Sequence, residues 1–215
     1  MKELKDYIDH TQLKPFATDK DIKMLCKEAI TYNFYAVCVN GCHVSLVKKL
    51  LMGSKVKIAS VIGFPLGAMS TVSKVAEAKE AIKDGADEID MVINIGWLKQ
   101  GDDKLVERDI AAVKNAIGDK VLKVIIETCY LTDEEKKTAC QLAMQAKVDF
   151  VKTSTGFGTG GATLADVKLM KKVVGDKLQI KASGGIRDQK TAKEYINHGT
   201  DRIGTSSGIA IVNNQ

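Results

Sequence analysis

The chain has 215 residues, of which 45% are hydrophobic and 27% charged, and its formal net charge at pH 7 is +5. This composition is ordinary for a globular protein, and the length suits one domain, residues 1–215, with a large core. The 32 basic residues are interspersed with 27 acidic ones and form no stripe with aromatic residues, which argues against nucleic-acid binding.

The N-terminus and the cysteines bear on cellular location. The first residues lack the apolar core of a signal peptide, and no apolar run approaches the roughly 18 residues that a membrane span needs. The five cysteines contain no C-x-x-C pair. Cys38, Cys42 and His43 are residue types that bind metals, but no second ligand pair accompanies them, so we expect free thiols in a reducing compartment. The prediction is a cytoplasmic protein.

Short apolar runs alternate with amphipathic stretches along the whole chain. The apolar runs predict strands at residues 8–13, 35–39, 56–62, 88–93, 121–127, 149–153, 178–182 and 202–205. Helical periodicity over 18–32 and a capping box from Thr132 to Glu135 predict two of the intervening helices. Glycines in positive-φ C-caps are expected after several helices, at Gly53, Gly85, Gly118, Gly175 and Gly199.

This alternation predicts an α/β fold in which the parallel strands close into a (β/α)8 TIM barrel after a short N-terminal helical segment. The alternative is an open doubly wound sheet, which usually has a glycine-rich turn after its first strand. Here the first strand runs into Leu13-Lys14-Pro15, and the glycine-rich loops follow the last three strands, where barrels often bind phosphate.

Strand parity places charged side chains inside the predicted barrel. Alternate residues of a strand point to opposite faces, so the apolar odd positions of 88–94 would contact helices and the even positions would face the lumen. The same test applied to the other strands gives one set of inward charges: Asp90, Lys123, Glu127, Lys152 and Lys181.

Lys152 and Lys181 lie on consecutive predicted strands, about 4.8 Å apart. Repulsion between two ammonium groups, together with desolvation, should make one of them lose its proton more readily, and a neutral amine can attack a carbonyl to form a Schiff base. Asp90 could then transfer protons. The alternative is a purely structural ion-pair network of the same five side chains.

Three loops are candidates for binding an anion: 154–161, 183–186 and 204–208. They are rich in glycines and hydroxyls, and the last two lead into predicted helices whose N-termini favour an anion. The alternative is that they are simple turns between strands and helices. Lysine chemistry beside a phosphate site suggests an enzyme acting on a phosphorylated carbonyl compound.

At these motifs the chain closely resembles the deoxyribose-phosphate aldolase family of class I aldolases, nearly from end to end. The matching motifs are Ile8-Asp9-His10-Thr11, Glu88-Ile89-Asp90-Met91-Val92-Ile93-Asn94, Val151-Lys152-Thr153-Ser154-Thr155-Gly156-Phe157, Lys181-Ala182-Ser183-Gly184-Gly185-Ile186-Arg187 and Arg202-Ile203-Gly204-Thr205-Ser206-Ser207-Gly208.

The resemblance implies a reversible cleavage of 2-deoxy-D-ribose 5-phosphate to D-glyceraldehyde 3-phosphate and acetaldehyde, in deoxynucleoside catabolism. It implies Lys152 as the Schiff-base residue, with Lys181 and Asp90 as proton donors and acceptors. It also implies a set of substrate- and phosphate-binding residues: Gly156, Gly184, Gly185, Ser206, Ser207, Asp9 and Thr11. No metal or other cofactor is needed in this class.

Three positions depart from the family pattern. Phe157 stands where some members have a lysine near the phosphate, and Gln12 stands where an apolar residue is usual. The last residues contain no tyrosine, whereas many members carry one in a C-terminal tail, so we expect either a slower enzyme or a proton transfer that relies on water alone.

The expected partner is a small phosphorylated sugar, with no nucleic acid and no membrane, and a homo-oligomer, dimer or tetramer, is compatible with this chemistry. Two other functions stay open at this point. One is a phosphosugar isomerase that uses Asp90 and a neutral lysine without a covalent intermediate. The other is an inactive barrel that senses sugar phosphates.

Overall fold

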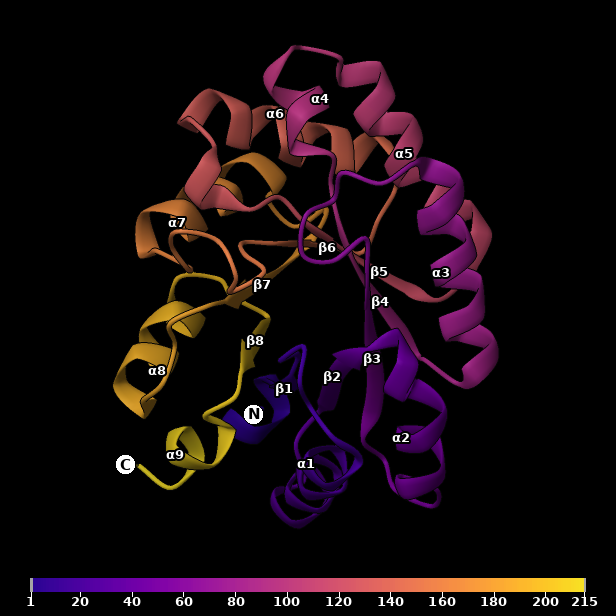
Figure 1. Ribbon diagram of the computed structural model, residues 1–215. Helices are drawn as coiled ribbons and strands as arrows, with labels where there is room; N and C mark the ends of the chain where they lie inside the picture. Colours follow the sequence, from indigo (N-terminus) through magenta and orange to yellow (C-terminus); the bar gives the residue numbers. More distant parts are fainter. Residues whose placement is uncertain (1, 215) are drawn as a thin grey trace.

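The computed structural model describes residues 2–214; Met1 and Gln215, the ends of the expected single domain, lie outside the described residues. Its strands β1 to β8 pair in sequence order, all in parallel, and β8 pairs with β1 to close the barrel. Figure 1 shows the helices arranged around this barrel. The predicted TIM barrel is therefore confirmed, and the open doubly wound sheet is wrong.

The observed strands are shorter than most of the predicted ones. Their bounds are β1 Ile8–Gln12, β2 Ala36–Asn40, β3 Lys57–Ile62, β4 Glu88–Val92, β5 Val121–Ile125, β6 Phe150–Lys152, β7 Gln179–Ser183 and β8 Arg202–Thr205. One difference is in β5, which was predicted to reach Glu127. The strand stops at Ile125, and Glu127 has a φ of 55°, which turns the chain out of the extended conformation.

The α-helices on the outside are α1 Asp19–Tyr32, α2 Val44–Leu50, α3 Thr71–Asp84, α4 Ile95–Lys99, α5 Asp103–Ile117, α6 Asp133–Gln145, α7 Leu164–Val174, α8 Gln189–Asn197 and α9 Gly208–Val212. Short 3-10 helices are η1 Leu4–Tyr7, η2 Gly41–His43 and η3 Thr128–Tyr130. The predicted N-terminal helical segment is thus η1, and it contacts α9 near the other end of the chain. Within residues 2–214 we find no helix that combines the length and the apolar character needed to cross a membrane.

Local sequence explains the helix ends. The predicted capping box is present in α6, where Thr132 accepts from the amide of Glu135 and the Glu135 carboxylate accepts from the amide of Thr132. Gly85 ends α3 in the left-handed conformation with φ 113°, which costs a glycine little. The other four predicted C-cap glycines also have positive φ.

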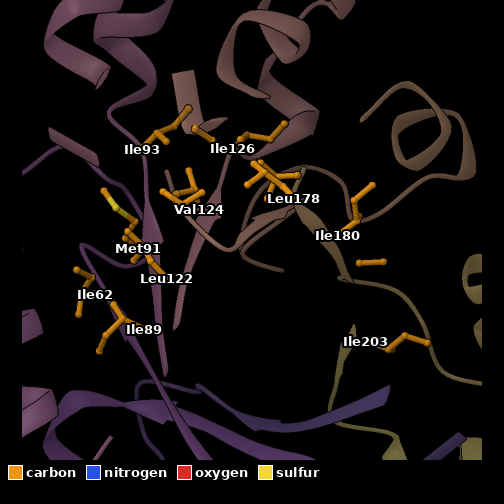
Figure 2. Close-up of a cluster of buried hydrophobic side chains, with 14 of the residues drawn as sticks. Ile62, Ile89, Met91, Ile93, Leu122, Val124, Ile126, Leu178, Ile180 and Ile203 are labelled. Carbon is orange, nitrogen blue, oxygen red and sulfur yellow. The ribbon is translucent and has the colours of Figure 1, made fainter. Parts of the chain in front are cut away.

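The main core lies between the barrel and the helices. It contains the outward-facing residues of the strands, such as Ile89 and Met91 on β4 and Leu122 and Val124 on β5, all of them buried (Figure 2). These apolar residues alternate with the inward-facing charges that strand parity predicts. The alternation is what allows a charged lumen to exist inside an apolar shell.

Aspartates connect neighbouring strands by hydrogen bonds at the N-terminal end of the barrel. Each one immediately precedes an even-numbered strand and accepts a hydrogen bond from the backbone amide of the preceding strand, in the pairs Asp87 with Ile58, Asp149 with Leu122 and Asp201 with Ile180. The carboxylates satisfy backbone groups at the end of the sheet. This repeat fixes the strand register at the end opposite to the glycine-rich loops.

Candidate active site

Asp90 lies at the centre of the barrel lumen and accepts hydrogen bonds from three lysines. Its Oδ1 is 2.8 Å from the Nζ of Lys123, and its Oδ2 is 2.9 Å from that of Lys152 and 2.7 Å from that of Lys181. The register aligns Asp90 with Lys123, and Lys152 with Lys181. Strand parity therefore correctly predicts that these four side chains converge.

A second set of ion pairs lies beneath this centre. Lys181 donates to Asp9 at 2.5 Å, and Arg202 donates to the other oxygen of Asp9 at 2.8 Å. Glu88 accepts from both Arg202 and Lys123, each at 2.5 Å. The ion-pair network is thus real, and it extends from Lys152 down to Arg202.

A glycine makes space for one of these charged side chains, and an aromatic ring covers another. A Cβ on Gly204 would lie 3.0 Å from the Lys181 Cε, so the glycine on β8 lets the lysine side chain pass from β7 toward Asp9 on β1. At the lower end, the guanidinium carbon of Arg202 lies 3.5 Å from the centre of the Tyr35 ring. This cation–π contact covers the charge at the barrel's closed end.

Electrostatics hold most of the network ionised. Burial raises the pKa of Asp90, but the three neighbouring ammonium groups lower it more, so the pKa lies well below its usual range. Burial lowers the pKa of Lys181, but Asp9 and Asp90 raise it more, and the result lies above the ordinary value. Sequence reasoning counted the repulsion between the lysines and missed the buried carboxylate Asp9, which keeps Lys181 charged.

The ionised network has one more cation than it has anions. The carboxylates are Asp9, Glu88 and Asp90, and the cations are Lys123, Lys152, Lys181 and Arg202. Among the carboxylates of residues 2–214, Lys152 pairs only with Asp90, which it shares with two other lysines, whereas Lys181 also pairs with Asp9. Buried charges are costly unless they are balanced. Lys152 is therefore the lysine of this network with the fewest carboxylate partners.

Of the three lysines that contact Asp90, Lys152 is the one that lines the cavity at the barrel mouth. This cavity has a volume of about 290 Å³. Its lining includes these residues from the predicted site: Thr11, Lys152, Gly156, Gly184, Gly185 and Ser206. The geometry thus joins a buried amine to an open pocket.

Glycines shape the phosphate side of the cavity. Gly184 and Gly185 have φ values of 87° and 85°, a conformation that favours glycine. Gly161 packs so closely on Gly184 that a Cβ there would lie 2.3 Å from the Gly184 carbonyl oxygen. Two of the predicted loops therefore pack against each other as a unit.

Two predicted contacts with the substrate are not in the cavity. Asp9 is fully buried beneath the pocket in its ion pairs with Lys181 and Arg202, since it lies two residues below Thr11 on β1. Ser207 does not line the cavity, and its amide donates to the Thr205 hydroxyl at 2.9 Å. Asp9 and Ser207 therefore contact other residues of the site instead of lining the cavity.

Glu127 is also placed differently from its prediction. It lies outside the lysine cluster, because the chain turns after β5, and its buried carboxylate accepts from the backbone amide and the hydroxyl of Thr155. A Cβ on Gly158 would lie 3.3 Å from the Glu127 carboxyl carbon. Glu127 therefore anchors the loop after β6.

Sequence reasoning missed several residues. Arg202 lies inside the barrel, and applying strand parity to β8 would have identified it. Glu88 faces the lumen as strand parity predicts, but its pairing with Arg202 and Lys123 was not predicted. Lys14 and Arg187 line the cavity and supply positive charge at its mouth. Lys14 directly follows the first predicted strand, and Arg187 directly follows the glycine-rich loop 183–186. Phe157 lines the same cavity with its ring 5.3 Å from that of Phe64, edge to face.

Comparison with known proteins agrees with this geometry. Residues 5–214 match the model of the DeoC/LacD family aldolases. The deoxyribose-phosphate aldolase of Finegoldia magna is 63% identical over 210 residues, covering 98% of this chain and 99% of that protein. That of Thermococcus gammatolerans is 60% identical over 214 residues, covering 98% and 95%.

Solved structures agree as well. The structure of a putative deoxyribose-phosphate aldolase from Coccidioides immitis superposes with a TM-score of 0.96 at 44% identity, covering 98% of this chain and 84% of that one. The deoxyribose phosphate aldolase from Aeropyrum pernix, described as a unique tetrameric structure, gives 0.89 at 32% identity, covering 98% and 89%. The chain therefore belongs to the DeoC/LacD family of aldolases.

Proposed function

We propose that this chain cleaves 2-deoxy-D-ribose 5-phosphate reversibly to D-glyceraldehyde 3-phosphate and acetaldehyde through a Schiff base on Lys152. Deoxyribose-phosphate aldolase activity follows from the close relatives. The structural observation that carries the mechanism is the position of Lys152. Its amine donates a hydrogen bond to Asp90, a carboxylate shared by three lysines, and Lys152 lines the cavity.

The amine supplies the covalent chemistry. The neutral Lys152 nitrogen attacks C1 of the open-chain sugar, and loss of water from the adduct gives a protonated imine. A base then removes the proton of the C3 hydroxyl, the C2–C3 bond breaks, and its electron pair passes into the C1–C2 enamine. Protonation of C2 and hydrolysis of the imine release acetaldehyde and return the free amine.

Lys181 and Asp90 are placed to move the protons. Lys181 is held charged by two carboxylates, so it can donate a proton to the departing oxygen of the first adduct. Asp90 is ionised at rest and contacts both Lys152 and Lys181. It becomes a better proton acceptor once one of its lysine neighbours has lost its charge.

The barrel mouth suits the phosphate group. Gly184, Gly185 and Ser206 line it, and Arg187 and Lys14 add cations. A dianion would be bound by backbone amides and positive side chains together. Phe157 is 48% exposed and carries no charge, so the positive charge at this pocket's mouth comes from other loops.

Borohydride trapping tests this proposal. Incubation with acetaldehyde and borohydride should add an ethyl group to Lys152, which peptide mapping by mass spectrometry would locate. Lys152→Ala should abolish both labelling and turnover. A label on another residue would refute the mechanism. Turnover of a sugar phosphate without labelling would indicate an isomerase, and calorimetric binding without turnover would indicate a sensor.

The proposal extends to location and assembly. A cytoplasmic enzyme is supported by the five cysteines, all of which are free thiols. Assembly into a homo-oligomer, dimer or tetramer, is supported by the relative from Aeropyrum pernix, whose structure is described as tetrameric. Light scattering would determine the state of this chain.

A further inference from the structure

Arg202 lies at the closed end of the barrel, away from the cavity where the substrate would bind. It is 4% exposed and does not line that cavity. Its guanidinium joins two carboxylates, Asp9 at 2.8 Å and Glu88 at 2.5 Å. Each of these carboxylates also contacts a lysine that contacts Asp90. Arg202 is therefore connected to the reacting end of the network through two separate routes.

The charge balance gives this connection a consequence. With Arg202 present, the network is neutral when Lys152 has lost its proton. Without Arg202, the network would be neutral with Lys152 still charged. We propose that Arg202 is a positioning residue that makes Lys152 available as a neutral amine, by supplying the fourth cation of the buried network. This inference rests on the proposed Schiff-base function of Lys152.

The surroundings of Arg202 contain few other charges that could take over this role. The titratable and charged groups that face the network come from six strands: Asp9 on β1, Cys38 on β2, Glu88 and Asp90 on β4, Lys123 on β5, Lys152 on β6 and Lys181 on β7. Tyr35, just before β2, also lies against the Arg202 guanidinium with its ring face. Burial raises the pKa of the Cys38 thiol, which keeps it uncharged. The count of charges in the lumen is thus set by the lysines, the three carboxylates and Arg202.

Two substitutions shift the charge balance in opposite directions. Arg202→Gln removes a cation but leaves Asp9 paired with Lys181 and Glu88 paired with Lys123, so neither carboxylate is left alone. Glu88→Gln removes an anion while nearly conserving the side-chain shape. The double variant restores the excess of one cation, and Arg202→Lys keeps the charge with different geometry.

The experiment measures the initial rate of borohydride trapping with acetaldehyde, and kcat/KM for the sugar phosphate, as functions of pH. Arg202→Gln should move the acidic limb of both profiles to higher pH by roughly one unit, because the network then retains its proton more strongly. Glu88→Gln should move it to lower pH. The double variant and Arg202→Lys should stay close to the wild-type profile.

A merely structural role would lower activity in both single variants without moving their profiles in opposite directions. Shifts of the same sign, or no shift, would overturn the inference. Should Arg202→Gln fail to fold, Glu88→Gln decides alone, and a limb that does not move to lower pH refutes the proposal. Trapping of the wild-type protein at Lys152 keeps the two questions apart, because its failure would refute the proposed function itself.

Discussion

Lys152 and Lys181 are paired across β6 and β7, and both donate to the same oxygen of Asp90. Their surroundings nevertheless differ. Lys181 has a second carboxylate in Asp9 and is fully buried, whereas Lys152 lines the cavity. Two chemically identical side chains can therefore take different roles, with Lys152 as nucleophile and Lys181 as proton donor.

The first prediction concerns Lys181. Lys181→Met should lower kcat by roughly 10²- to 10⁴-fold, because the proposed proton donor is lost. Steady-state kinetics on 2-deoxy-D-ribose 5-phosphate would measure it. Slow labelling of Lys152 by acetaldehyde and borohydride should persist. A variant with wild-type kcat would contradict the role.

Lys74→Met is the matched substitution outside the barrel. Lys74 is also fully buried, but it pairs with Asp109 at 2.5 Å between α3 and α5. Its removal leaves Asp109 buried without a cation, and we expect a loss of roughly 3–5 kcal/mol in unfolding free energy. Urea denaturation would measure the loss, and kcat per folded molecule should not change. A large fall in kcat here would mean that the kinetics of buried-lysine variants report general disruption.

Glu127 should matter for phosphate binding rather than for the covalent step. Glu127→Gln weakens the hydrogen bonds to Thr155 that hold the loop after β6. We expect KM for the sugar phosphate to rise about tenfold, equivalent to about 1.4 kcal/mol, with trapping by acetaldehyde unchanged. Glu135→Gln, in the capping box of α6, is the control and should change neither. An unaltered KM in Glu127→Gln would rule out the anchoring role.

Gly161→Ala tests the close packing of the two phosphate loops. The added Cβ would lie 2.3 Å from the Gly184 carbonyl oxygen, so one of the loops must move. KM for the sugar phosphate should rise more than tenfold while acetaldehyde labelling continues. Gly41→Ala is the control, because its nearest heavy atom would be 3.9 Å away. Equal KM values in the two variants would show that the loops adjust without cost.

The buried ion pairs should also shape stability as a function of pH. The pKa values of Asp9 and Asp90 are lowered, so their contribution is present above about pH 4 and is lost as pH falls further. Those of Lys123 and Lys181 are raised, so their contribution is complete below about pH 10.4 and is lost as pH rises further. The unfolding free energy should therefore be highest between these limits.

Chemical denaturation at a series of pH values would measure this dependence. Asp9→Asn should flatten the acidic side of the curve, because the group whose pKa differs between the folded and unfolded states is gone. The control variant is Asp119→Asn, at an exposed position. An acidic slope that is the same in Asp9→Asn and wild type would assign it to other carboxylates.

The sequence determined the architecture because apolar and polar residues alternate with a period of two in each strand and about 3.6 in each helix. The same alternation placed Asp90, Lys123, Lys152 and Lys181 on inward positions, and the structure confirms each of them. The lysine before the glycine-rich loop was thus identifiable as a buried amine beside a binding pocket.

Only the tertiary structure decided how these charges are shared. Asp9 and Arg202 are 193 residues apart in the chain, and their contact depends on β8 closing onto β1. Parity also could not indicate that β5 ends two residues before Glu127, because a single positive φ removes a residue from the strand's alternation. Periodicity tells which face a side chain occupies, whereas barrel closure and local turns decide its depth and its partners.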